Sequence, residues 1–287
     1  MVFVALDPRL RGDERGRVLL IDRVVGFSAV LYRLALRFIR ATLLMEKNVQ
    51  DGFDKSKIPV LGAEDVDQIN KALRRLKKRR KKEIVVEGIF LKSKLAWKVA
   101  TYQEAVLYRS VMLAEGCVLA WNMNNSLSSF LSARAFVETV AVFLDFEQQC
   151  VGYLDKSDFS SIDELVTNRT FSTRDEKWVR ESPETSAINV LTAIDRIDRR
   201  MIEGLRRHYD FLSERCHPNW LGQLFFFSKL DTNTGITTYS ENMNMQANLD
   251  HVLGGMLLVG LLENSLKRVD QMVIRLAGAH SSFDPVR

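Results

Sequence analysis

The stretch from residue 127 to residue 151 constrains the fold more than any other part of the chain. Leucine, phenylalanine, valine and alanine recur in it at helical spacing, and they fall on every side of the predicted helix instead of along one stripe. A helix that is apolar all round must be covered by neighbouring elements. We therefore expect residues 127–151 to form the central helix of a helical bundle.

Two charged residues, Arg134 and Glu138, interrupt this apolar helix one turn apart. An ionised side chain in an apolar environment costs several kcal/mol unless it is paired and hydrogen-bonded. Two explanations are open. The two side chains pair with each other, or they project into a polar pocket that they share with a second helix and the turn after it. The partners that this second helix and turn offer are Tyr209, His217, Asn219 and Asp195.

Apolar residues at steps of three and four predict further helices on both sides of the central one. They cover residues 19–45, 63–82, 93–123, 187–217 and 246–279. Pro218 ends the helix that precedes it, because proline lacks an N–H group and disfavours helical geometry in the residue before it. Apolar and β-branched runs at 224–227 and 236–239 flank a turn sequence, which predicts a β-hairpin within 222–240. Residues 84–91 fit either a strand or a helix.

The predicted fold is therefore mainly α, a helical bundle of long antiparallel helices with one small β-hairpin. We divide the chain into an extension without structure at residues 1–18, N-terminal helices with a basic run at 19–92, and the bundle at 93–280. With 287 residues, 46% of them hydrophobic, the chain can bury one large core or two smaller ones.

The cysteines and the apolar runs favour a cytoplasmic protein. Three cysteines without CxxC spacing are typical of reduced thiols. The charges in residues 1–17 exclude a signal peptide, which needs a continuous apolar core. Residues 252–262 are apolar throughout, but eleven residues are too few to cross a bilayer, so we predict no transmembrane segment. Gly254, Gly255 and Gly260 would permit close helix packing, either inside the domain or across a homodimer.

Eight of the nine residues at 74–82 are lysine or arginine, and they surround the end of a predicted helix. One interpretation is a solvated helix end whose cations complement the helix dipole. The other is a contact with a polyanion, either RNA or an anionic lipid surface, in which Arg79 and Arg80 are binding residues. No aromatic residue lies within the run, so its sequence does not support base stacking.

Common motifs of nucleotide-binding and metal-dependent enzymes are missing. The sequence contains no GxxxxGK[ST] phosphate loop, no GxGxxG after a strand, no HExxH and no GxSxG. Its four histidines include no i,i+4 pair, which argues against a histidine-based metal site. We therefore predict no cofactor and no metal. Cys216 adjoins His217 in the sequence and is a candidate nucleophile only if the fold also pairs the two in space.

Three segments resemble a family of uncharacterised bacterial proteins. They are residues 132–139 (SARAFVET), 188–195 (INVLTAID) and 209–219 (YDFLSERCHPN). That family is all-helical and distantly similar to the HEPN superfamily of helical bundles, and the resemblance extends over roughly residues 94–276. Residues 2–17 resemble the peptide translated from a dispersed repeat in bacterial genomes, which implies that they lie outside the fold.

The HEPN resemblance implies a metal-independent ribonuclease, in which an arginine and a histidine separated by four to six residues act on the scissile phosphate. No arginine precedes His208, His217 or His251 at that spacing, and Arg215 is too close to His217. The resemblance therefore fits a non-catalytic relative at least as well as a nuclease.

Three functional hypotheses are open. In the first, Arg134, Glu138, Tyr209 and His217 line the polar pocket of a binding or regulatory module for a nucleotide, RNA or another anion, with Asn219 and Asp195 beside them. In the second, the chain is a metal-independent ribonuclease of a defence or toxin system. Its catalytic residues are then Arg134, Glu138 and His217, with His217 as general acid–base and Arg134 stabilising the phosphorane. In the third, the chain is an oligomerising scaffold that uses its glycine-rich terminal helix.

Overall fold

The computed structural model describes residues 51–58, 62–241, 243 and 245–281, which belong to one compact unit, Gln50–Arg287. The helix predicted at 19–45 and the extension predicted at 1–18 lie outside the described residues.

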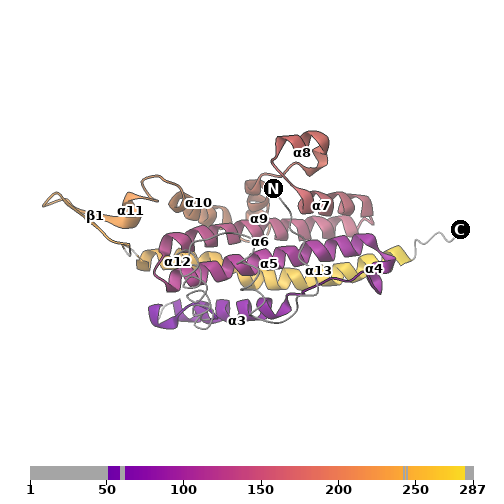
Figure 1. Cartoon of the computed structure of the whole chain (residues 1–287), viewed down its shortest axis with the longest axis horizontal. Coiled ribbons are helices and arrows are strands. Elements are labelled where there is room, and N and C mark those ends of the chain that lie inside the picture. The colour runs from indigo at the N-terminus through magenta and orange to yellow at the C-terminus, as the bar shows by residue number, and fades with distance from the viewer. Residues whose placement is uncertain (1–50, 59–61, 242, 244, 282–287) are drawn as a thin grey trace, which may run out of the picture. The chain divides into compact units, whose positions relative to one another are not determined.

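The described chain is built from helices with a single two-stranded antiparallel sheet (Figure 1). In chain order its elements are η1 (Lys55–Lys57), α3 (Ala63–Arg79), α4 (Ile89–Lys92), α5 (Lys94–Asn122), α6 (Ser126–Leu154), α7 (Phe159–Phe171), α8 (Glu176–Glu181), η3 (Pro183–Thr185), α9 (Val190–Arg200), α10 (Leu205–Cys216), α11 (Leu224–Phe227), β1 (Ser228–Asp231), β2 (Ile236–Tyr239), α12 (Met245–Met256) and α13 (Leu258–Ser281). The predicted fold class, mainly α with one small β-hairpin, is confirmed.

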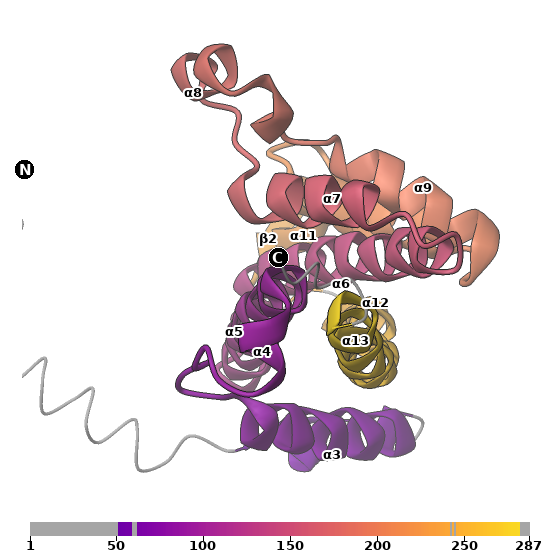
Figure 2. The ribbon, with the colours of Figure 1, turned by 90° about the vertical axis from the view of Figure 1, so that its right-hand side faces the viewer.

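Helix α6 is the central helix, as its apolar composition predicts. It contacts α5, α7, α9, α10, α12 and α13. Figure 2 shows α7 and α9 on one side of it and α5, α12 and α13 on the other. The Asn125 side chain caps its start by accepting a hydrogen bond from the Ser128 N–H at 3.0 Å. The helices around α6 therefore bury many of its apolar side chains, whereas Leu131 and Val151 remain exposed.

Among the described residues, α6 alone combines the length and the apolar composition of a membrane-spanning helix. Half of its most apolar stretch is buried against the rest of the chain. The core helix of a bundle has the same length and composition, so this observation alone assigns α6 to neither class.

The single helix predicted at 187–217 is two helices, so this prediction is wrong. Between α9 and α10 lies Gly204, whose φ of 87° is in the left-handed region that glycine adopts without strain. The N–H groups of Met201 and Ile202 both donate to the Ile197 carbonyl and close α9. Both helices still pack on α6.

The single helix predicted at 246–279 is likewise interrupted, between α12 and α13. A Cβ atom on Gly254 would lie 2.9 Å from the His208 ring, and one on Gly255 would lie 3.2 Å from Val137 Cγ2. These glycines therefore let α12 approach α10 and α6 closely. That is the first of the two roles considered for them, packing inside the domain.

Helix α3 shares the core of the later helices. It contacts α13, α5 and α12, and its buried residues Ile69, Leu73 and Leu76 belong to the same hydrophobic cluster as theirs. The predicted boundary at residue 92 therefore falls inside one compact unit. Residues 84–91 contain no strand. They run as irregular chain into the short helix α4.

The hairpin is shorter than predicted. Leu224–Phe227, expected to begin its first strand, form the helical turn α11. Phe226 of this turn is buried against Phe130 of α6, with ring centroids 5.4 Å apart, and this contact anchors the hairpin to the bundle. Strands β1 and β2 follow with Ser228 opposite Tyr239. Figure 1 shows them reaching away from the helices.

Candidate functional site

The two charged residues of α6, Arg134 and Glu138, meet Tyr209 of α10, and we call these three residues the α6–α10 network. Arg134 Nη2 donates to the Tyr209 hydroxyl at 3.2 Å, and that hydroxyl donates to Glu138 Oε1 at 2.8 Å. Arg134 Nε and Glu138 Oε1 also form an ion pair at 3.2 Å. The two charges therefore pair with each other, as the first explanation expects, and Tyr209 is the one of the four predicted partners that joins them.

His217 does not join this network. It is the residue after the end of α10, it is exposed, and among the described residues no hydrogen bond or ion pair connects it to Arg134 or Glu138. The predicted set of Arg134, Glu138 and His217 is therefore not assembled. The backbone of His217 is extended, with φ −86° and ψ 149°, so its side chain does not continue the helical path of α10.

Cys216, the last residue of α10, lies close enough to Arg134 for the guanidinium to act on its thiol. Burial raises the pKa of the Cys216 thiol to about 11, although the neighbouring Arg134 guanidinium opposes the shift. The thiolate, not the thiol, is the nucleophile. A thiol with this pKa stays protonated near neutral pH, so the burial of Cys216 argues against its role as a nucleophile.

Asn219 and Asp195 have other partners. The Asn219 side chain donates to Glu214 Oε2 at 2.7 Å and accepts from the Gly222 N–H at 2.9 Å, so it closes the turn after α10. Asp195 forms an ion pair with Arg206 at 2.7 Å. Neither residue takes part in the α6–α10 network.

A second charged site in α6 escapes the sequence analysis. Asp145 is fully buried, and its Oδ2 atom accepts from Arg169 of α7 and Arg196 of α9 at 3.3 Å each, and from Gln149 at 2.7 Å. Its Oδ1 atom has no hydrogen-bond partner among the described residues. Asp145 could have been identified in the same way as Arg134, because it is also a charged residue inside an apolar helix.

The basic run at 74–82 divides into paired and unpaired side chains. Three of its cations tie α3 to other parts of the chain through the ion pairs Arg75–Glu263, Lys77–Asp51, Lys77–Glu115 and Arg79–Asp270. Arg80 lies over the ring of Tyr108 of α5, 5.2 Å from its centroid. Arg74, Lys78, Lys81 and Lys82 form no ion pair with another described residue. The run is therefore partly structural and partly available to a partner.

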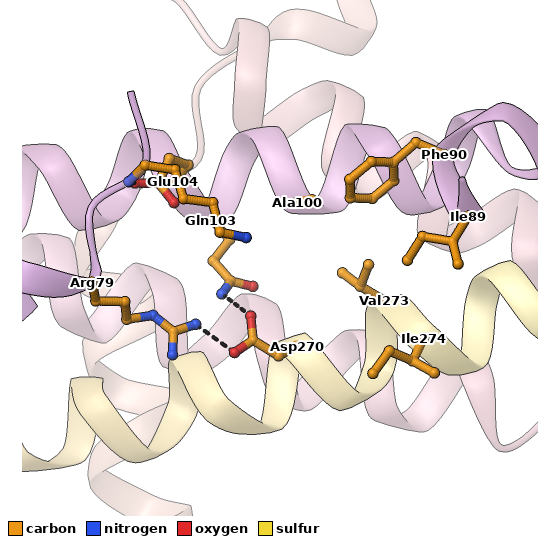
Figure 3. Close-up of a pocket in the computed structure, with 10 residues that line it drawn as sticks. Arg79, Ile89, Phe90, Ala100, Gln103, Glu104, Asp270, Val273 and Ile274 are labelled. Atoms are coloured by element: carbon orange, nitrogen blue, oxygen red, sulfur yellow. Dashed lines mark hydrogen bonds and ion pairs between the residues drawn. The ribbon is translucent and has the colours of Figure 1, made fainter. Parts of the chain in front are cut away.

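A pocket of about 310 Å³ lies where the end of α3 meets α4, α5 and α13 (Figure 3). We call it the α13 pocket. It is lined by Arg79, Lys81, Ile89, Phe90, Ala100, Gln103, Glu104, Asp270, Val273 and Ile274. Its volume is at the lower end of the range for small-molecule sites, roughly 300–1,000 Å³. Arg79, a predicted binding residue, lines this pocket, and Arg80 does not.

One end of the α13 pocket is polar, and its hydrogen bonds converge on Asp270. Arg79 Nη2 donates to Asp270 Oδ2 at 2.6 Å, and Gln103 Nε2 donates to Oδ1 at 2.8 Å. Glu104 Oε1 accepts from the backbone N–H of Lys81 at 2.7 Å. Arg79 Nη1 and Lys81 Nζ have no bonded partner among the described residues, so both can donate to a bound group.

Gln103 is the buried polar residue of the pocket with unused hydrogen-bonding capacity. It is 5% exposed, and its Oε1 atom has no donor among the described residues. Its Nε2 donates to Asp270 and, at 3.2 Å, to the Leu266 carbonyl, which fixes the orientation of the amide. A buried polar atom without a partner costs about 1–3 kcal/mol.

The other end of the α13 pocket is apolar. Figure 3 shows Ile89 and Phe90 of α4 near Val273 and Ile274 of α13, away from the polar end. Ile89 and Ile274 are 42% and 56% exposed. Covering such side chains with an apolar group is favourable because it removes apolar surface from water. The pocket therefore combines polar recognition with an apolar wall.

The fourth histidine, His280, is preceded by an arginine at the HEPN spacing, unlike the other three histidines. Arg275 and His280 have four residues between them, and both lie in α13. Arg275 Nη2 forms an exposed ion pair with Asp155 Oδ1 at 3.4 Å. Counting back from His280 in the sequence is enough to find this pair.

Among the residues that the structure describes, no group of three or more histidine, cysteine, aspartate and glutamate residues is placed to hold a metal ion. Comparisons with protein-family models, with curated proteins and with solved structures give no match. The resemblance to a HEPN-like bacterial family therefore stays a prediction.

Proposed function

We propose that this chain is a binding module that holds a small amphipathic carboxylate in the α13 pocket. The observation that carries this proposal is the division of the pocket into two ends. The polar end has unused donors and an unsatisfied buried amide oxygen, and the apolar end is exposed. The class of function is the one expected from the sequence, a module for an anion, but its site moves from the α6–α10 network to the α13 pocket.

The unused groups at the polar end define the head group of the ligand. Arg79 Nη1 and Lys81 Nζ can donate to a carboxylate, and hydrogen bonds between charged groups are the strong ones. The Glu104 carboxylate can accept from an N–H or O–H group on the same ligand. A carboxylate that also carries a donor satisfies both sets, as the head group of a hydroxy acid or of a zwitterionic amino acid does.

The apolar wall defines the rest of the ligand. Ile89, Phe90, Val273 and Ile274 can cover an apolar group of the size of a leucine or phenylalanine side chain. Burial of such a group contributes about 1.5–3 kcal/mol. The class that fits both ends is therefore an apolar amino acid or a hydroxy acid of similar size.

Calorimetric titration with three probes that differ only in the head group tests this proposal. We expect L-phenylalanine to bind, 3-phenylpropionate to bind about tenfold more weakly because it lacks the donor, and phenethylamine to fail because it lacks the carboxylate. Arg79→Gln should abolish binding. Arg75→Gln is the matched control, since Arg75 pairs α3 with α13 through Glu263 outside the pocket. Equal binding of L-phenylalanine to both variants, or no binding at millimolar concentration, would overturn the proposal.

A metal-independent ribonuclease is the second candidate, and the spacing of Arg275 and His280 favours it. Lys81 and Ile274 line the same pocket, so the basic run ends near the turn of α13 that carries Arg275. Unpaired lysines there can contact the phosphates of RNA, which gives salt-dependent affinity.

Incubation of the protein with RNA in EDTA separates this candidate from the first. Cleavage that is lost in His280→Ala and kept in His217→Ala supports a nuclease with the Arg275/His280 pair. No cleavage at any protein concentration removes the nuclease. RNA retention without cleavage, lost when Arg74, Lys78 and Lys82 are neutralised, would support only the polyanion contact.

A further inference from the structure

The β1–β2 hairpin exposes its apolar side chains. Leu230, Ile236 and Tyr239 are 57%, 59% and 70% exposed. Outside the hairpin itself, the strands mainly contact α11. Figure 1 shows both strands reaching away from the helices. A two-stranded hairpin alone is at best marginally stable in water, and three or more strands are the usual requirement. The hairpin therefore exposes apolar side chains, and additional strands would stabilise it.

Strand β1 presents an outward-facing backbone edge centred on Leu230. The Ser240 N–H donates to the Phe227 carbonyl at 2.9 Å, so these two residues form a hydrogen-bonded pair of the antiparallel ladder. Such pairs alternate along the ladder with non-hydrogen-bonded pairs. With the observed register, Lys229 is in a hydrogen-bonded pair and Leu230 is not. The N–H and C=O groups of Leu230 therefore point away from β2.

The charges of β1 are self-complementary about this residue. Lys229 and Asp231 flank Leu230, and both are exposed. If a second copy of β1 aligned antiparallel with Leu230 opposite Leu230, each lysine would lie opposite the aspartate of the other copy. Opposite charges directly across two strands are stabilising. The Asp231 Oδ1 atom already accepts from the Asn233 N–H at 2.9 Å within the turn, which leaves Oδ2 for the lysine.

We propose that two copies of this chain associate through β1, and that their hairpins form a four-stranded antiparallel sheet in the order β2–β1–β1–β2. The two Leu230 residues exchange both backbone hydrogen bonds at the two-fold axis, and two Lys229–Asp231 pairs flank them. The same patch serves on both copies, so the assembly closes as a dimer. The outer edge of β2 carries no charged residue between Ile236 and Tyr239, so it offers no matching complementarity.

Sedimentation of the full chain over a range of concentrations tests the backbone part of this proposal. Leu230→Pro removes the outward N–H, which β2 does not use, so the hairpin can persist while the dimer should dissociate. Leu230→Thr keeps the N–H and β propensity and should remain dimeric. A wild-type chain that is monomeric at every concentration overturns the proposal.

Charge variants test the register. Lys229→Glu places like charges opposite each other twice and should weaken the dimer about tenfold, whereas Lys229→Arg should leave it within about twofold. A dimer that persists in both Leu230→Pro and Lys229→Glu lies elsewhere on the molecule and also overturns the proposal. Circular dichroism of each variant shows whether the helical bundle is intact, so that loss of the dimer is not mistaken for unfolding.

Discussion

Asp145 joins three helices through one carboxylate, because its Oδ2 atom accepts from Arg169 of α7 and Arg196 of α9. The Arg169 side chain is only 5% exposed, so it has little water to replace a lost carboxylate. Asp145→Asn removes the charge and should lower the free energy of unfolding by about 3–5 kcal/mol, as breaking a buried pair does.

Urea denaturation measures the effect of Asp145→Asn, and Asp155→Asn is its control. Asp155 pairs with Arg275 at 3.4 Å with both side chains exposed, so its loss should cost less than about 1 kcal/mol. Equal effects of the two variants would mean that the buried cluster does not hold α7 and α9.

His251 makes the stability of the protein depend on pH. Its ring stacks on Phe211 with centroids 3.4 Å apart. Burial, and then the charges of Arg215 and His208, lower the pKa of His251 to about 4. An unfolded histidine titrates near 6.5, so between about pH 6.5 and 4 the unfolded chain binds a proton that the folded chain does not. The contribution of His251 to the free energy of unfolding is therefore fully present above pH 6.5, and it is lost as the pH falls toward 4.

Thermal unfolding between pH 7 and 4 tests this dependence. Because the ring is partly exposed, the loss due to His251 should be about 1 kcal/mol after screening by solvent. His251→Phe keeps the stack on Phe211 and should reduce the dependence on pH. An identical slope in the wild type and the variant would exclude His251 as its source.

Among the elements, the turn after α10 depends on one small residue. A Cβ atom on Gly222 would lie 2.0 Å from the His217 carbonyl oxygen and 2.9 Å from that of Arg215. Both atoms belong to the backbone and cannot move aside without changing the turn. Gly222→Ala should therefore lower the free energy of unfolding by about 2 kcal/mol or more.

Gly152→Ala in α6 is the matched control for Gly222→Ala, because its Cβ would meet nothing within 4 Å. Alanine is the better helix former, so this variant should gain about 0.5–1 kcal/mol. Calorimetric melting should shift the two variants in opposite directions. Parallel shifts would mean that the turn tolerates a Cβ at position 222.

The long helices could be predicted because their apolar periodicity is local, whereas their interruptions depend on the tertiary fold. A glycine inside a helix costs only about 1 kcal/mol, so Gly204 alone does not decide between a bend and a break. Leu224–Phe227 are equally ambiguous: four apolar residues fit a strand, and the contact of Phe226 with Phe130 selects a helical turn. Short apolar runs cannot be assigned from periodicity alone.

The candidate sites differ in how visible they are in the sequence. Arg134 and Glu138 stand out because charges are rare in an apolar helix, and Tyr209 follows from the apolar face of the helix that packs there. The α13 pocket has no such signal. Gln103 and Asp270 are 167 residues apart in the chain, and each is unremarkable in its own amphipathic helix. Their meeting depends on how α5 and α13 pack, which one sequence does not reveal.

At the scale of the whole molecule, the basic run has a structural role that neither interpretation of its sequence included. Arg75 and Arg79 tie α3 to α13 through Glu263 and Asp270, so part of the run holds the bundle together. The Arg79–Asp270 pair also forms part of the polar end of the α13 pocket. A ligand there would bridge α3, α4, α5 and α13 and would stabilise the folded chain, since it binds the native state only.

Methyl NMR of the full chain during titration with L-phenylalanine tests the ligand site most directly. The α13 pocket predicts that the methyl resonances of Ile89, Val273 and Ile274 shift together and saturate. Those of Leu119 and Ile236, which are exposed outside the pocket, should remain in place. Absence of any shift at millimolar probe, or shifts confined to residues outside the pocket, would contradict the assignment of this site.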